Sequence, residues 1–296
     1  MPRLLRDGAR RLGASSAAVW ALDPRSGWID VFEYDGARGH ARTLTASELG
    51  VDSLIGREDL PTLVEPRLSV GEVEDDHTTP VVCGGQSLGV LAVAVEDGRE
   101  LDELERQLVA DLARHLGIAL ENARLYEQAI RDDLTGLYLK RHFLDRLHEE
   151  IDRARRYGKP MAVLMADLDH FKRVNDERGH LSGDRVLREL ARLILASVRS
   201  SDIVGRFGGE EIALILPEQA AAGARRAAEK VRQAVEASQF PAADEGPPIE
   251  ITLSLGVAVF PGDGDDVDAL LSAADQALYE AKRQGRNRVC SGGPTA

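Results

Sequence analysis

The sequence predicts an α/β (α+β) protein of two domains joined by a long helix, and three observations lead to this expectation. The chain has 296 residues, which at roughly 150 residues per domain allows about two domains. Hydrophobic residues make up 43% of the chain and charged residues 29%, a composition typical of folded globular proteins. A stretch with helical periodicity separates two regions that each mix strand-like and helix-like patterns.

Charge and cysteine content exclude several classes of protein. Acidic residues outnumber basic ones by 50 to 37, and this excess repels nucleic-acid phosphates and anionic membranes, so we expect neither partner. Cys83 and Cys290 have no cysteine or histidine at metal-ligand spacing, which argues against a disulfide framework and a zinc site. No run reaches the roughly 18 apolar residues of a membrane span, and residues 1–11 lead into no apolar core of a signal peptide. We therefore expect a cytoplasmic protein.

The first third of the chain predicts two hairpins. Ser16–Leu22 and Trp28–Tyr34 are rich in β-branched and aromatic residues and are separated by turn formers. Thr79–Cys83 and Ser87–Val95 form a second pair around a glycine-rich turn. The segment from Asp35 to Glu74 shows weak periodicity, so little room is expected there for a ligand pocket.

Residues 100–131 predict one long helix, because they contain no proline and a single glycine. Apolar or small side chains recur at a spacing close to the roughly 3.5 to 3.6 residues of a helical repeat. His115 and Asn122 lie in the same seam, where polar residues can fix the register between two identical helices. The seam fits a dimer contact and a helix packed on its own domain equally well. The recurring positions are Leu104, Leu108, Leu112, Ala119, Tyr126 and Ala129.

Beyond residue 132, strand-like and helix-like segments alternate, which predicts an α/β or α+β domain. The expected elements are a strand at Met161–Ala166, a helix at Gly183–Val198, a hairpin of Ile203–Phe207 and Glu210–Leu216, a helix at Ala220–Ala237, a strand at Ile249–Phe260 and a helix at Val267–Gln284.

Two acids follow the apolar strand expected at residues 161–166. Asp167 and Asp169 are two residues apart, so they lie on the same face of the chain. A strand end that reaches solvent explains this pattern. A hard-cation site explains it as well, because Mg²⁺ is held by one or two carboxylates while phosphate oxygens and water complete its octahedron.

A second pair of acids follows two glycines. Gly208 and Gly209 form a tight turn that would let a phosphate-bearing ligand approach the backbone. Adjacent strand residues point to opposite faces, so Glu210 and Glu211 cannot both be simple surface residues on a strand buried on both sides. A plain hairpin with a solvated edge remains the alternative for this segment alone. Two acid clusters in one domain favour a metal site.

Five ordered motifs spread over about 160 residues resemble those of the GGDEF diguanylate cyclases. The GGEEI at Gly208–Ile212 is a close variant of the signature that gives this family its name. The resemblance implies that residues 132–296 form a GGDEF nucleotidyl-cyclase-like domain with a central, mostly antiparallel sheet flanked by helices. The other matching segments are Asp133-Leu134-Thr135-Gly136-Leu137, Asp167 to Lys172, Asn175-Asp176 with Gly179-His180 and Gly183-Asp184, and Leu278 to Asn287.

The resemblance implies an enzyme that condenses two GTP molecules into cyclic di-GMP and releases two pyrophosphates. Each 3′-hydroxyl would attack the α-phosphate of the other GTP. Two Mg²⁺ ions per GTP site, with Mn²⁺ as a possible substitute, would be held by Asp167, Glu210 and the carbonyl of Leu168. Glu211 would bind metal or accept the proton of the 3′-hydroxyl, which makes Asp167, Glu210 and Glu211 the expected catalytic residues.

The same resemblance implies the contacts to GTP. Asn175 and Asp184 would read guanine, because a carboxylate accepts from the ring N–H groups and a wrong base leaves polar groups unpaired. Lys172, Lys282 and Arg286 would bind the β- and γ-phosphates, although a solvated basic helix also explains the last two. The other substrate contacts implied by the motifs are His170, Phe171, Gly208 and Gly209.

Arg199-Ser200-Ser201-Asp202 resembles the inhibitory RxxD site at which the family binds its product. Arginine can pair with guanine O6 and N7, and aspartate can accept from the guanine amino group. The two-fold symmetry of the product requires two domains that face each other, so we expect a homodimer whose encounter is controlled by the helix at residues 100–131.

Residues 1–120 resemble a GAF sensor domain, on the segments Leu88–Val93 and Gly117–Tyr126. The resemblance implies a sensory or dimerisation domain with an unknown small-molecule ligand or none, and its end overlaps the linker helix at residues 100–131. Cys83 could attach a chromophore, but a buried cysteine without a function is the more common case.

Two other functions remain alternatives. A non-catalytic receptor would bind GTP or cyclic di-GMP through Arg199 and Asp202, but the retention of the acidic residues argues against it. Another purine nucleotide cyclase, or an enzyme of mixed products, is disfavoured by Asp184, and identification of the product with and without ATP would separate these cases.

Overall fold

The structure is a computed structural model that describes residues 2–12, 14–23, 28–34, 39–44, 77–95, 99–243 and 246–292. The chain divides into two compact units, Met1–Glu127 and Gln128–Ala296. Apart from β3 (Gly39–Leu44), the segment between Asp35 and Glu74 lies outside the described residues, as does the turn at residues 24–27. No helix in the described parts of the chain combines the length and the hydropathy that a membrane span requires.

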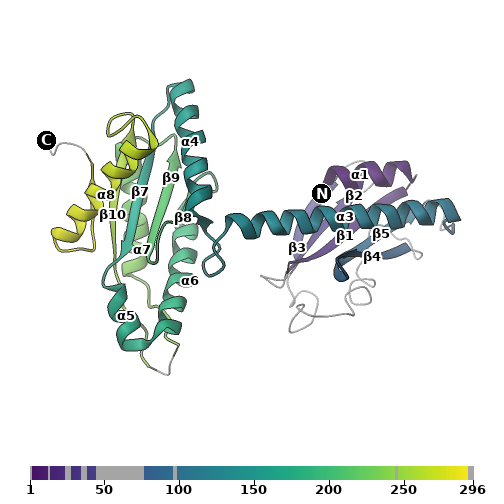
Figure 1. Cartoon of the computed structure of the whole chain (residues 1–296), viewed down its shortest axis with the longest axis horizontal. Coiled ribbons are helices and arrows are strands. Elements are labelled where there is room, and N and C mark those ends of the chain that lie inside the picture. The colour runs from purple at the N-terminus through teal and green to yellow at the C-terminus, as the bar shows by residue number, and fades with distance from the viewer. Residues whose placement is uncertain are drawn as a thin grey trace. The chain divides into compact units, whose positions relative to one another are not determined.

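The first unit is an antiparallel sheet of five strands in the order β3-β2-β1-β5-β4 (Figure 1). Both predicted hairpins are confirmed, because β1 pairs with β2 and β4 pairs with β5. Helix α1 (Pro2–Arg11) and strand β3 were not predicted from the sequence. The other strands are β1 (Ala14–Asp23), β2 (Trp28–Tyr34), β4 (His77–Cys83) and β5 (Gln86–Val95).

The predicted long helix is confirmed as α3 (Glu103–Ile130). Its start is fixed by a capping box, in which Glu105 N–H donates to the Asp102 side chain at 2.8 Å and Asp102 N–H donates to the Glu105 side chain at 2.9 Å. One face of α3 is buried in the core of the unit. Leu112, which was predicted on the seam, instead packs closely against α1. Its side chain lies so near Gly8 that a Cβ at that position would be only 2.6 Å away.

The second unit contains a six-stranded mixed sheet in the order β11-β10-β7-β9-β8-β6. The three central pairs are antiparallel, whereas the edge pairs β10–β11 and β6–β8 are parallel. The strands are β6 (Tyr138–Leu139), β7 (Met161–Leu168), β8 (Ile203–Arg206), β9 (Glu211–Pro217), β10 (Leu253–Phe260) and β11 (Val289–Ser291).

Helices cover both faces of this sheet (Figure 1). Met161, Val163 and Met165 of β7 pack in one core with α4 and α8, while the alternate residues Ala162 and Leu164 pack in the other core with α6 and α7. All of β7 is buried, which explains its unbroken apolar run. The helices are α4 (Lys140–Tyr157), α5 (Phe171–Arg178), α6 (His180–Ser197), α7 (Ala221–Glu236) and α8 (Val267–Arg283).

Most predicted elements of this unit occur within a few residues of their expected bounds. The strand predicted from Ile249 begins only at Leu253, because Ile249 instead forms an isolated bridge with Phe240. Glu210 was predicted to begin a strand but lies in the turn before β9. Helix α4 was not predicted from the sequence at all.

An ion pair fixes the turn between β8 and β9. The Nη1 atom of Arg206 lies 2.9 and 3.0 Å from the two carboxylate oxygens of Asp132, and both side chains are mostly buried. The same guanidinium donates to the carbonyls of Gly208 and Gly209, with Nη2 2.8 Å from the latter. Burial raises the pKa of Asp132, but hydrogen bonds from Thr135 and Arg206 outweigh this effect and hold the pKa below its usual value.

We expect Asp132→Asn to lower the free energy of unfolding by about 2 kcal/mol at pH 7, because it removes a charge-assisted hydrogen bond to Arg206. The folded-state pKa of Asp132 is below the ordinary value of 3.8, so the ionised carboxylate stabilises the fold above that pH. The difference between parent and variant should shrink as the pH falls from 3.8 through the folded-state pKa. Urea unfolding of both proteins from pH 7 to pH 3 measures this, and a difference independent of pH would contradict the assignment.

Candidate active site

The two acid clusters meet at one end of the central strand. In the register of the sheet, Asp167 of β7 lies opposite Glu211 of β9 and opposite Ser254 of β10. Glu210 precedes Glu211 in the turn that Arg206 holds. Residues more than 40 positions apart in the sequence, Asp167 and Glu210 among them, are thereby brought to the same edge of the sheet.

Asp167 is 7% exposed, and the Nζ atom of Lys282 lies 2.9 Å from its Oδ1. Burial raises the pKa of Asp167, and the attraction of Lys282 offsets only part of this effect. Burial and the negative charge of Asp167 also raise the pKa of Glu210. The two carboxylates are therefore close enough to repel each other, and the site favours added positive charge.

These groups fit a divalent cation that keeps part of its own ligand shell. Among the described residues, no group of three or more acidic, histidine or cysteine side chains forms a complete metal cage. Asp167 and Glu210 supply two oxygen ligands, and Mg²⁺ commonly takes one or two carboxylates together with water and phosphate oxygens. Leu168 ends β7 with its side chain buried, so only its carbonyl is suited to a ligand role.

Glu211 is held close to the glycine turn. Its main-chain oxygen accepts hydrogen bonds from Phe207 N–H at 2.8 Å and Gly208 N–H at 3.3 Å. A Cβ on Gly208 would lie 2.5 Å from the Glu211 carboxylate, so a larger residue at this turn position would displace the Glu211 side chain. Gly209 has open space where its Cβ would be.

Asp169 has a different role from Asp167. Its carboxylate accepts from the hydroxyls of Thr252 and Ser254, both at 2.7 Å, and from the main-chain N–H of Asn287 at 3.0 Å. The sequence placed the two acids on one face as a candidate cation site. The three donors around Asp169 instead make it a link between β7, β10 and the segment that follows α8.

The residues expected to read guanine lie on α5 and α6. Asn175 is near the end of α5 and Asp184 is in the first turns of α6, and both are partly exposed. The Asn175 amide oxygen lies directly over Gly183, so closely that a Cβ there would overlap it. Asn175 is thereby placed beside the residue that precedes Asp184.

The other residues expected to contact the substrate differ in their exposure. Lys172 and Arg286 are exposed, whereas Phe171 is 5% exposed and packs in the core with α6. Only the backbone of Phe171 is therefore suited to contact a ligand. His170, just before α5, has a positive φ of 61°.

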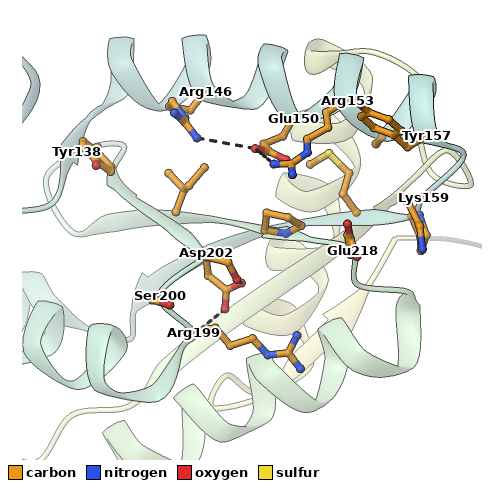
Figure 2. Close-up of a pocket in the computed structure, with 16 residues that line it drawn as sticks. Tyr138, Arg146, Glu150, Arg153, Tyr157, Lys159, Arg199, Ser200, Asp202 and Glu218 are labelled. Atoms are coloured by element: carbon orange, nitrogen blue, oxygen red, sulfur yellow. Dashed lines mark hydrogen bonds and ion pairs between the residues drawn. The ribbon is translucent and has the colours of Figure 1, made fainter.

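Arg199 and Asp202 line a separate pocket of about 570 Å³ (Figure 2). Asp202 accepts from Arg199 N–H at 2.9 Å and donates its own N–H to the Arg199 carbonyl at 3.0 Å, which closes the turn. The facing wall comes from α4, where Arg146 and Arg153 flank the buried Glu150 (Figure 2). None of the expected metal ligands lines this pocket.

Several residues of these sites were not found from the sequence. Asp132 and Arg206 lie next to the recognised motifs. Asp132 was missed because the first motif was taken to begin at Asp133, the second acid of the Asp132-Asp133 pair. Arg146 and Arg153 belong to α4, whose apolar residues Phe143, Leu147 and Ile151 recur every four positions. That helical spacing was the available signal.

Comparison with known proteins supports the assignment of the second unit. Residues 129–288 match the family described as "Diguanylate cyclase, GGDEF domain". The response regulator PleD of Caulobacter vibrioides is 42% identical over 163 residues, which are 55% of this chain and 36% of PleD. Diguanylate cyclase DgcP of Pseudomonas aeruginosa is 32% identical over 280 residues, 90% of this chain and 38% of DgcP. The chain thus spans little more than a third of the length of these curated relatives.

Solved structures show the same likeness. The GGDEF domain of DgcB from Caulobacter crescentus, in complex with c-di-GMP, is 34% identical with a TM-score of 0.52 and covers 55% of this chain and 93% of its own. A structure of the coiled coil and GGDEF domain of DgcB is 31% identical with a TM-score of 0.58 and covers 64% of this chain and 100% of its own. The family match covers more than half of the chain and contains the acids at the end of β7, so the chain belongs to the GGDEF diguanylate cyclase family.

Proposed function

We propose that the protein is a diguanylate cyclase that condenses two GTP molecules into cyclic di-GMP and releases two pyrophosphates. The observation that carries this proposal is the meeting of Asp167 with Glu210 and Glu211 beside the glycine turn, within a GGDEF domain. Bound Mg²⁺, two ions per GTP site with Mn²⁺ as a substitute, supplies charge neutralisation at the triphosphate. Asp167, Glu210 and the Leu168 carbonyl hold these ions.

The other residues orient the substrate. Asp184 accepts from the N–H groups of guanine and Asn175 assists it, so adenine leaves both groups unsatisfied. Lys172, Lys282 and Arg286 bind the β- and γ-phosphates, which requires Lys282 to leave Asp167 or to bridge it to the nucleotide. Glu211 accepts the proton of the attacking 3′-hydroxyl or binds metal. His170, Phe171, Gly208 and Gly209 supply further contacts to GTP, Phe171 through its backbone because its side chain is buried.

We expect Glu210→Ala to lower the formation of cyclic di-GMP from GTP and Mg²⁺ by about 100-fold or more, because metal ions supply several kcal/mol of charge stabilisation. Chromatography and mass identification of the nucleotide product measure it. Asp275→Ala, at an exposed acid of α8, is the matched control and should keep the parent rate. If the parent binds GTP as a dimer yet forms no product, either an input signal at the first unit is missing or the receptor alternative replaces the enzyme.

We infer that the active form is a homodimer that associates through α3. On the exposed face of this helix, seven residues are spaced alternately four and three positions apart, which is the spacing of a coiled-coil contact, and four of the seven are leucine or isoleucine. Leu104 is 65% exposed and Leu125 is 52% exposed. The DgcB structure joins a coiled coil to a GGDEF domain. The exposed positions are Leu104, Leu108, Asp111, His115, Ile118, Asn122 and Leu125.

Leu108→Lys should shift the protein towards monomer at micromolar concentration, because it places like charges opposite each other in the seam. Turnover per chain should fall with it and recover as the protein concentration rises. Light scattering and product assays measure both, with Leu195→Lys on α6 as the exposed control. A monomeric parent with undiminished turnover would exclude the dimer.

We also infer that the first unit is a GAF-like sensory or dimerisation domain. Its five-stranded antiparallel sheet packs against α1 and α3 on one face, and the similarity to DgcP extends over this unit. Its ligand, where it has one, is an unidentified small molecule.

We further infer that cyclic di-GMP inhibits the enzyme by binding in the pocket of Arg199 and Asp202. The pocket sets two further arginines, Arg146 and Arg153, opposite the RxxD turn, which suits an anionic ligand with guanine bases (Figure 2).

Arg199→Ala should raise the product concentration for half-inhibition roughly 10-fold, the loss of one bidentate contact to guanine, without lowering the initial rate. Arg192→Ala on α6 removes an exposed arginine outside the pocket and serves as the control. An inhibition curve identical to that of the parent would remove this site.

A further inference from the structure

The segment that follows α8 adopts an unusual backbone conformation. Gly285, Arg286 and Asn287 have successive positive φ angles of 116°, 64° and 45°. Residues other than glycine adopt this left-handed conformation at a cost in free energy, so surrounding contacts must hold it in place. Arg286 lies in the middle of this segment, which directly follows the end of α8 where the Nζ atom of Lys282 lies 2.9 Å from Asp167 Oδ1.

The main chain of Asn287 is tied to the end of β7. Its N–H donates to Asp169 Oδ2 at 3.0 Å. Asp169 is 4% exposed and is itself held by the hydroxyls of Thr252 and Ser254 at 2.7 Å. The segment after α8 is therefore attached to Asp169, which follows Asp167 by two residues in the sequence.

The side chain of Asn287 is tied to α7. Its amide nitrogen donates to Glu236 at 2.6 Å, and its amide oxygen accepts from Arg232 at 2.6 Å. The Arg232 side chain is 12% exposed and also pairs with Glu229 at 2.7 Å and Glu236 at 2.8 Å. The Asn287 amide is thus held between Arg232 and Glu236, which also pair with each other, and this arrangement makes a rigid anchor.

We propose that Asn287 is a positioning residue that directs Arg286 to the triphosphate of the substrate. This inference rests on the proposed function of Arg286 as a phosphate ligand. Asparagine suits the position because it tolerates positive φ and offers a donor to Glu236 and an acceptor to Arg232 at once. Asn287 itself touches no substrate, and its loss costs contacts to the β- and γ-phosphates but none to guanine.

Asn287→Gly tests this directly, because glycine keeps the main-chain N–H and the positive φ and removes only the side-chain anchor. Affinities are measured with 3′-deoxy-GTP, which lacks the nucleophile, and with GMP, which lacks the β- and γ-phosphates. The variant should bind 3′-deoxy-GTP roughly 10-fold more weakly, and its affinity for GMP should stay within about twofold of the parent. In turnover, KM for GTP should rise more than kcat falls.

Arg232→Gln provides a second variant with the same expected pattern. Arg192→Gln is the matched control, because Arg192 pairs with Glu189 at 2.6 Å in the same i,i+3 arrangement but far in sequence from this segment. In an Arg286→Ala background, Asn287→Gly should have no further effect on the affinity for 3′-deoxy-GTP.

The proposal would be overturned if Asn287→Gly lowered the affinities for 3′-deoxy-GTP and GMP by the same factor. It would also be overturned if Asn287→Gly weakened 3′-deoxy-GTP binding as much in the Arg286→Ala background as in the parent. Because both affinities are measured without turnover, a parent that binds 3′-deoxy-GTP but makes no cyclic di-GMP refutes the proposed function alone. A parent with no preference for 3′-deoxy-GTP over GMP refutes the role of Arg286 and the positioning role together.

Discussion

The antiparallel pairing of β7 with both of its neighbours is the constraint on which the candidate active site depends. Side chains alternate along a strand, so a slip of one residue in either pair would move Asp167 to the opposite face of the sheet. The apolar residues Met161 to Ala166 are buried in two cores, one on each face of the sheet, and hold β7 between β9 and β10. Hydrophobic packing thus determines where a charged group is held, and the free energy it releases offsets the cost of burying that charge.

The functional segments leave this sheet as turns, and each has its own polar anchor. Arg206 ties the glycine turn to Asp132, and Asp169 ties the segment after α8 to β7 and β10. Turns present backbone groups and unpaired side chains to a ligand. A turn keeps one conformation only when contacts with residues outside the turn hold it in place. In this chain, Asp132 and Arg206, which lie next to the recognised motifs, and Asp169, which lies within one, supply those contacts.

The sequence predicted the ordered motifs and most strands and helices that carry them, because β7 and the later helices have clear periodicity. Helix α4 was missed because its apolar positions are spread among many charged residues, and β6 and β11 are too short to show any pattern. The different roles of Asp167 and Asp169 were not predictable, because they depend on Thr252 and Ser254, more than 80 residues away. The pocket of Arg199 likewise joins segments that only the folded sheet brings together.

Helix α3 runs without interruption through the boundary between the two units, since it extends from Glu103 to Ile130 and the boundary follows Glu127. Each residue of an α-helix turns it by about 100° and lengthens it by about 1.5 Å. Insertion of a single residue in α3 would therefore rotate the rest of the helix by about 100°, whereas insertion of seven residues, nearly two full turns, would almost restore the original rotation. A domain that replaced the first unit would therefore have to end in a helix of matching phase.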